Sequence, residues 1–187
     1  MSKKIGVIGS GQVGQMLASG FLKHGYDTMI GSRDPKKLDD WAVANEGGQT
    51  GTMSEAASHG EVIILAVSGE GALASIEAMG TENLSGKIIL DATNPIDHTR
   101  DPEDGMVPFF TDLNGSLMER LQDAAPDAHF VKCFNSVGNA LMIDPALEGG
   151  IKPTMFICGN SEHAKSETTT ILNGIGWDAM DMGTAKA

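Results

Sequence analysis

Three glycines near the start of the chain have the spacing that accommodates a dinucleotide pyrophosphate. Gly9-x-Gly11-x-x-Gly14 follows an apolar run at residues 4–8 and opens a helical pattern at 12–24. Gly9 permits a tight turn, Gly11 has no side chain to hold the backbone away from a phosphate, and Gly14 lets the helix pack closely on the strand. The phosphates then lie at the positive end of the helix. The strand–turn–helix context therefore favours a dinucleotide-binding loop over a merely tight turn.

A second motif indicates which dinucleotide binds. The first helix is expected to stop at Gly25, so that residues 27–30 form the second strand and Ser32 and Arg33 follow it. An NAD-binding domain has a carboxylate there for the ribose hydroxyls. Serine, the Arg33 guanidinium and the Lys37 ammonium suit a 2′-phosphate instead, which favours NADP(H). The alternative makes Asp34 the ribose ligand and leaves the basic residues on a solvated face.

Composition points to one soluble domain. The chain has 187 residues, of which 41% are hydrophobic and 24 are glycine, and a formal net charge of −12 that argues against a nucleic-acid or membrane partner. It contains no apolar run of about 18 residues and no signal-peptide core, so we predict a cytoplasmic protein. Cys133 and Cys158 lack metal or redox spacing and are interpreted as small core residues.

Strand-like and helical patterns alternate along the chain, which is typical of βαβ units. We predict strands at 4–8, 27–30, 48–50, 61–67, 87–92, 129–134, 154–158 and 177–180, and helices at 12–24, 35–45, 53–58, 70–79, 114–124 and 161–173. The expected fold is α/β: a Rossmann-type, doubly wound and mainly parallel sheet of about eight strands with helices on both faces. Residues 94–111 contain three prolines and form a predicted loop, a candidate lid.

Ligands of such a sheet gather outside the carboxyl ends of its strands. Small and amide-bearing residues follow three predicted strands and could bind a ribose or a carboxamide while a second flat ring approaches. They are Ala66, Val67 and Ser68; Asn94 and Pro95; and Asn135, Val137, Gly138 and Asn139. The competing interpretation is ordinary turn chemistry.

These motifs resemble those of the NADP oxidoreductases dependent on coenzyme F-420, an 8-hydroxy-5-deazaflavin, and of the reductase domain of membrane metalloreductases. The resemblance rests on residues 9–14, on Gly31-Ser32-Arg33 with Lys37, on 91–95 and on 131–136. It implies hydride transfer between NADP(H) and a stacked deazaflavin or flavin such as FMN or FAD. It also implies a homodimer.

Carried over by position, the resemblance implies a role for each motif. Ser10, Gln12 and Val13 would contact the pyrophosphate, and Ser32, Arg33 and Lys37 the 2′-phosphate. Val67 and Ser68 would contact the nicotinamide half, and Val137, Gly138 and Asn139 would lie near the two rings.

The chain departs from the family at two places. Residues 67–70, Val-Ser-Gly-Glu, stand where members often have a Pro-Trp pair, and the family typically continues into further helices beyond the position of residue 187. We therefore expect a single NADP-binding domain, residues 1–187, without those helices.

No side chain is predicted to be a catalytic acid or base, because the cofactors carry the chemistry, and no metal site is predicted. His98, in the 94–111 loop, is a solvent-exposed residue in this interpretation, with proton donation as the alternative. Two other functions stay open: an NADP(H) sensor or partner-dependent reductase module, and a reductase of small C=O or C=N substrates.

Overall fold

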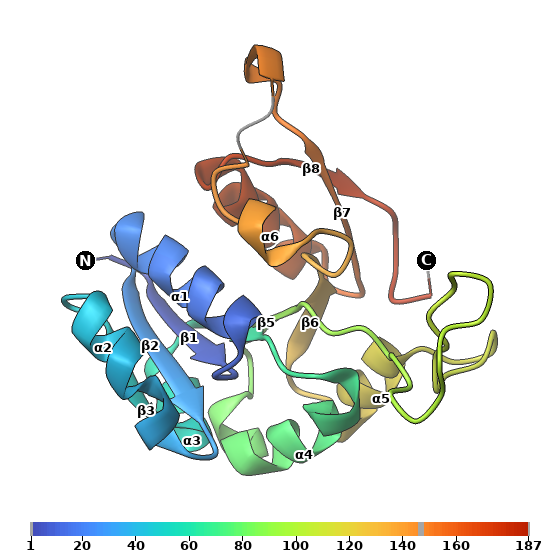
Figure 1. The fold of residues 1–187 in the computed structure, drawn as a ribbon, viewed down its shortest axis with the longest axis horizontal. Helices are drawn as coiled ribbons and strands as arrows, with labels where there is room; N and C mark the ends of the chain where they lie inside the picture. The colour runs from blue at the N-terminus through green and yellow to red at the C-terminus, as the bar shows by residue number, and fades with distance from the viewer. Residues whose placement is uncertain (1, 146–147, 187) are drawn as a thin grey trace.

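A computed structural model describes residues 2–145 and 148–186, and its centre is an eight-stranded sheet (Figure 1). The strands are β1 Lys4–Ile8, β2 Asp27–Ser32, β3 Gln49–Thr52, β4 Val62–Leu65, β5 Ile88–Asp91, β6 His129–Lys132, β7 Thr154–Gly159 and β8 Asp178–Asp181. Their order is β3-β2-β1-β4-β5-β6-β7-β8. The strand order reverses between β1 and β4, so the crevice expected to bind ligands lies above these two strands.

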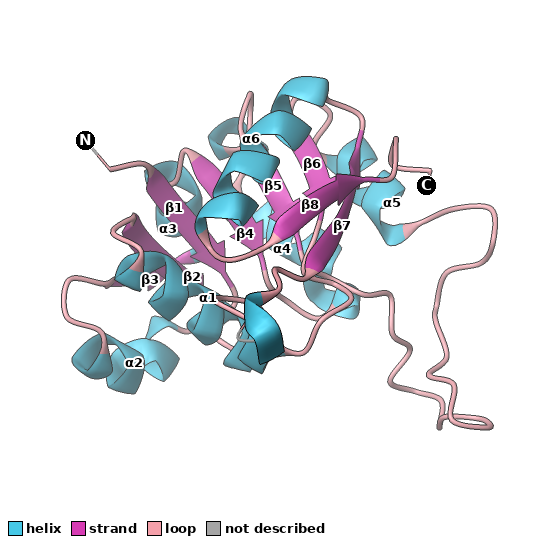
Figure 2. Ribbon diagram, turned by 90° about the horizontal axis from the view of Figure 1, so that it is seen from above, coloured by secondary structure: helices cyan, strands magenta, loops and turns pink. Residues whose placement is uncertain are grey.

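Helices cover both faces of the sheet, as the sequence predicts (Figures 1 and 2). The helices are α1 Gln12–Lys23, α2 Asp39–Ala44, α3 Met53–His59, α4 Gly69–Met79, α5 Leu117–Ala124 and α6 Glu162–Gly174. Buried side chains of α1, α2 and α6 share one core with Val7, Ile64 and Leu90. Those of α3, α4 and α5 share the other core with Ile8 and Ile63. Alternate residues of the central strands β1, β4 and β5 thus enter opposite cores, which explains their nearly continuous apolar runs.

The predicted doubly wound fold is confirmed, with small changes at element ends. The helix predicted at 114–124 begins at Leu117, because the Ser116 hydroxyl accepts the Glu119 N–H while the Glu119 carboxylate accepts the Ser116 N–H. The helix predicted at 35–45 is a 3₁₀ turn, Pro35–Leu38, followed by α2. β7 runs antiparallel to β6, whereas the other neighbouring strands are parallel.

The loop between β5 and α5 is irregular and extends away from the body of the molecule (Figure 2). Isolated bridges join Ile96 to Phe109 and Glu103 to Met106, so the segment folds back on itself as a long arm. Among the described residues, no helix combines the length and apolar character that crossing a membrane requires.

Candidate dinucleotide site

The glycine loop joins β1 to α1 with the geometry that the sequence predicts. Gly9 has a φ of 127°, and a Cβ there would lie 2.2 Å from the carbonyl oxygen of Ala66. A Cβ at Gly14 would lie 1.9 Å from the carbonyl oxygen of Gly9, so the helix packs directly on the turn. A Cβ at Gly11, by contrast, would have no atom within 4 Å. The loop therefore leaves room at Gly11 for a pyrophosphate at the start of α1.

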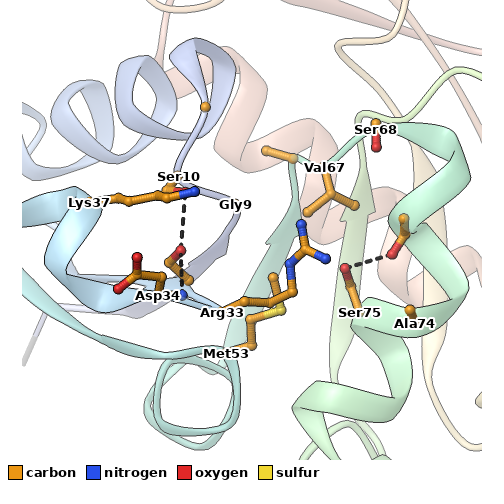
Figure 3. A pocket seen from close by; sticks show the side chains of 14 residues that line it. Gly9, Ser10, Arg33, Asp34, Lys37, Met53, Val67, Ser68, Ala74 and Ser75 are labelled. Atoms are coloured by element: carbon orange, nitrogen blue, oxygen red, sulfur yellow. Dashed lines mark hydrogen bonds between the residues drawn. The ribbon is translucent and has the colours of Figure 1, made fainter. Parts of the chain in front are cut away.

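A cavity of about 470 Å³ lies beside this loop, above the carboxyl ends of β1, β2 and β4 (Figure 3). Its walls come from the glycine loop, the end of β2, the start of α3, the end of β4 and the body of α4. The lining residues are Gly9, Ser10, Gly11, Ser32, Arg33, Asp34, Lys37, Met53, Ala66, Val67, Ser68, Gly71, Ala74 and Ser75. Residues from two separate sequence motifs thus line one space.

Ser32 connects the two motifs. It is the last residue of β2 and is buried, and its hydroxyl donates to the Ser10 hydroxyl at 3.1 Å. The same oxygen accepts the backbone N–H of Asp34 at 3.2 Å. These bonds fix the turn that presents Arg33 and Lys37, whose exposed side chains line the cavity. In Figure 3 the Arg33 side chain reaches toward Ser75 of α4.

The charges at the end of β2 suit a ribose that carries a 2′-phosphate better than one with free hydroxyls. Two cationic side chains line the cavity in a chain whose formal net charge is −12. A guanidinium can bind a phosphate through two parallel N–H groups, and an ammonium adds a point charge. Asp34 also lines the cavity, so the carboxylate considered as a ribose ligand lies within the same space.

Comparisons with known proteins agree with this geometry. Residues 4–95 match the family model described as NADP oxidoreductase, coenzyme F-420-dependent. The crystal structure of a proposed F-420-dependent NADP-reductase from Arthrobacter sp. fb24 superposes with a TM-score of 0.87 at 32% identity, over 98% of this chain and 86% of that one. The chain belongs to this family of NADP-dependent oxidoreductases.

Two curated relatives of the family are similar over much of the chain. The F420-dependent NADP reductase of Methanothermobacter marburgensis is 30% identical over 158 residues, which are 75% of this chain and 66% of that protein. Metalloreductase STEAP3 of Rattus norvegicus is 28% identical over 183 residues, 97% of this chain. The chain spans about a third of the length of that metalloreductase, since the match covers 34% of it.

The remaining predicted residues of this oxidoreductase do not line the cavity. Gln12 is exposed on the first turn of α1, Val13 is half-buried, and Gly14 is buried against the glycine turn. Asn94 and Pro95 follow β5, and Asn135 with residues 137–139 follows β6. The structure brings these two loops together, because the Asn94 side-chain amide donates to the carbonyl oxygen of Asn135 at 2.7 Å.

Four lining residues have no counterpart in the sequence prediction. Met53 begins α3 directly after β3, and Gly71, Ala74 and Ser75 come from α4. Small and apolar residues inside a helix resemble ordinary core, so the α4 residues carry no recognisable signal. Met53 could have been found, because it follows the carboxyl end of a parallel strand as the other site residues do.

The thiols and the His98 side chain lie outside this cavity. Cys133 is fully buried, and burial raises the pKa of its thiol well above the ordinary value. Cys133 and Cys158 pack into opposite cores, so the sheet separates them. His98 is exposed on the arm. Among the described residues, no group of three metal-ligating side chains is present.

Proposed function

We propose that the protein is an NADP(H)-dependent oxidoreductase that transfers a hydride between the nicotinamide and coenzyme F-420 or a flavin. The observation that carries the proposal is the cavity that the glycine loop shares with Ser32, Arg33 and Lys37. In this proposal the glycine loop holds the pyrophosphate, and the residues after β2 hold the 2′-phosphate in the same cavity. The family match supports the same cofactor.

The adenosine half is held by charge and shape. Arg33 and Lys37 bind the 2′-phosphate, while Ser32 fixes the turn through its bonds to Ser10 and Asp34. Met53 and Ala74 contribute apolar surface to the same cavity, which suits a flat base. In this proposal the preference for NADPH over NADH therefore comes from the residues at the end of β2.

The reacting half lies over the ends of β4, β5 and β6 in this proposal. NADPH supplies a hydride from its nicotinamide, and the acceptor is the second substrate. The chain contributes position and exclusion of water, through Val67 and Ser68 on one side and residues 137–139 on the other. Residues 67–70, Val-Ser-Gly-Glu, stand where the resemblance places a Pro-Trp pair in many family members, so the acceptor pocket of this chain differs in this proposal.

One observation favours a second candidate. The chain matches about a third of a metalloreductase, in which further segments accompany the matched part. A reductase module of this kind would bind NADPH by itself and pass electrons only when its partner is present. For both candidate functions we propose that this NADPH-binding domain acts in the cytoplasm, where NADPH is available.

Turnover with a panel of acceptors tests the proposal. The purified protein is mixed with NADPH and with F-420, FMN or FAD, and NADPH oxidation is followed by its absorbance. Oxidation that depends on one of these acceptors supports the reductase. Tight NADPH binding without turnover on any acceptor would contradict independent activity and favour the partner-dependent module.

A further inference from the structure

A buried ion pair at the ends of β5 and β6 has no part in the cofactor contacts proposed above. Asp91 and Lys132 end these two strands and face each other in the sheet register. Asp91 is fully buried, and the Lys132 ammonium donates to its Oδ2 at 2.6 Å and to the carbonyl oxygen of Thr93 at 2.9 Å. The other carboxylate oxygen accepts the N–H and the hydroxyl of Thr93. This network fixes the backbone that leads into Asn94.

Asn94 is then held from two sides. Its side-chain amide donates to the carbonyl oxygen of Asn135 at 2.7 Å, which ties the loop after β5 to the loop after β6. On its other side lies the first residue of α4, where a Cβ on Gly69 would come within 2.2 Å of the Asn94 carbonyl oxygen. Gly69 directly follows Val67 and Ser68. Asn94 therefore lies between the two loops assigned to the nicotinamide and to the acceptor.

Phe134, the residue before Asn135, constrains the backbone that carries the Asn135 carbonyl group. Phe134 is fully buried and has a φ of 63°, a left-handed conformation that bulky residues rarely adopt. Its N–H donates to the Sδ atom of Met155 at 3.2 Å. Such a conformation persists only where the surrounding packing dictates it. The bond from Asn94 thus ends on a rigid acceptor.

We propose that Asn94 is a positioning residue that sets the separation of the nicotinamide-binding loop and the acceptor-binding loop. The inference rests on the proposed function, because it assigns the two rings to these loops. Its side-chain nitrogen is engaged by Asn135, so the residue acts through the backbone it joins rather than through that nitrogen. Hydride transfer depends steeply on the separation and alignment of the reacting atoms, and a shift of about 1 Å can cost about 100-fold in rate.

The test compares Asn94→Ala and Asn94→Asp with a matched control, Asn83→Ala. Neither Asn94 variant can donate to the Asn135 carbonyl. Asn83 also donates its side-chain amide to a backbone carbonyl, that of Met79 at 2.7 Å, but at the far end of α4. Three quantities are measured on the whole chain: the NADPH dissociation constant by calorimetry, kcat with the best acceptor, and the fluorescence lifetime of the nicotinamide of bound NADPH.

Both Asn94 variants are expected to lower kcat at least about tenfold and to change the nicotinamide lifetime. The dissociation constant should stay within about twofold, because Asn94 does not line the adenosine cavity. The control should match the wild type in all three quantities. Asn94 variants that match the control in kcat and lifetime would overturn the inference and leave the proposed function standing. An equal loss of kcat and affinity with a lowered Tm would also overturn the inference, because it would indicate a general loss of structure.

Failure of the proposed function gives a different result. If the wild type binds NADPH but none of the acceptors supports its oxidation, the proposed reaction is contradicted. The nicotinamide lifetime then decides the inference alone: a change confined to the Asn94 variants supports it, and no change overturns it.

Discussion

At the residue scale, two glycines of one motif have different physical tasks. A Cβ at Gly11 meets no atom within 4 Å, whereas a Cβ at Gly14 would lie 1.9 Å from the Gly9 carbonyl oxygen. Gly11 also has a φ of −77°, which alanine adopts readily. Gly14 is thus needed for the fold, whereas the fold does not require Gly11, which our proposal assigns to the pyrophosphate.

We predict that Gly11→Ala keeps the wild-type Tm and weakens NADPH binding at least about tenfold, since the methyl group occupies the pyrophosphate approach. Gly14→Ala should lower the free energy of unfolding by more than about 2 kcal/mol, because helix and turn must separate. Thermal unfolding and calorimetry measure the two effects. A Gly11→Ala variant that binds NADPH normally would show that the pyrophosphate lies elsewhere.

In the proposed function, Arg33 distinguishes NADPH from NADH. Arg33→Ala should weaken NADPH binding by about 2 kcal/mol, or about 30-fold, and leave NADH binding nearly unchanged, because only the 2′-phosphate forms the charge-assisted bond. Lys36→Ala is the matched control, since Lys36 is exposed nearby but does not line the cavity. Equal losses for both cofactors would be inconsistent with a 2′-phosphate contact at Arg33.

At the element scale, the arm between β5 and α5 is organised by Asp97. Its carboxylate accepts the hydroxyl and N–H of Thr99 and the Nε–H of Arg100, and these bonds lower its pKa to about 2. Arg100 also donates to the Phe109 carbonyl oxygen, on the returning side of the arm. One carboxylate thus holds the base of the arm together.

The arm should keep this order above about pH 4, the ordinary carboxyl value, and lose it as the pH falls toward 2. The sign follows from a pKa that is lower in the folded state. An NMR titration of the Asp97 carboxyl carbon should give a midpoint near 2. Thr99→Ala should raise that midpoint toward about 4. An unshifted midpoint in the wild type would contradict these contacts.

The sequence predicts elements well where the signal is local. The glycine loop and the stop of α1 before Gly25 follow from turn chemistry and periodicity, and the structure confirms them. The second strand, predicted at 27–30, runs two residues further and includes Ser32. The antiparallel course of β7 was not predicted, because a buried strand has the same apolar pattern in either direction.

Contacts between distant residues were not predictable in the same way. Asp91 accepts the N–H and the hydroxyl of Thr93 within its own turn, which is the local contact that an aspartate before a loop commonly makes. Its ion pair with Lys132, 41 positions away, depends on the register of β5 and β6. The wall formed by Ala74 and Ser75 depends likewise on how α4 packs beside β4.

At the scale of the whole molecule, the far end of the sheet presents apolar side chains to solvent. Phe156 of β7 and Met180 of β8 are register partners, and each is 50% exposed. Exposed apolar surface of this kind favours association. We therefore expect a homodimer that buries this end of the sheet.

Sedimentation equilibrium should give twice the mass of one chain for the wild type. Phe156→Ser should shift the protein toward monomers, and Val43→Ser, a control at an 88% exposed position on α2, should not. A monomeric wild type at micromolar concentration would contradict the dimer.

The most direct test of the account is a calorimetric titration of the wild-type protein with NADPH and, separately, with NADH. The arrangement of Ser32, Arg33 and Lys37 around one cavity predicts that NADPH binds at least about tenfold more tightly. Equal affinities, or tighter NADH binding with Asp34 as the ribose ligand, would contradict the assignment of the end of β2 as a 2′-phosphate site.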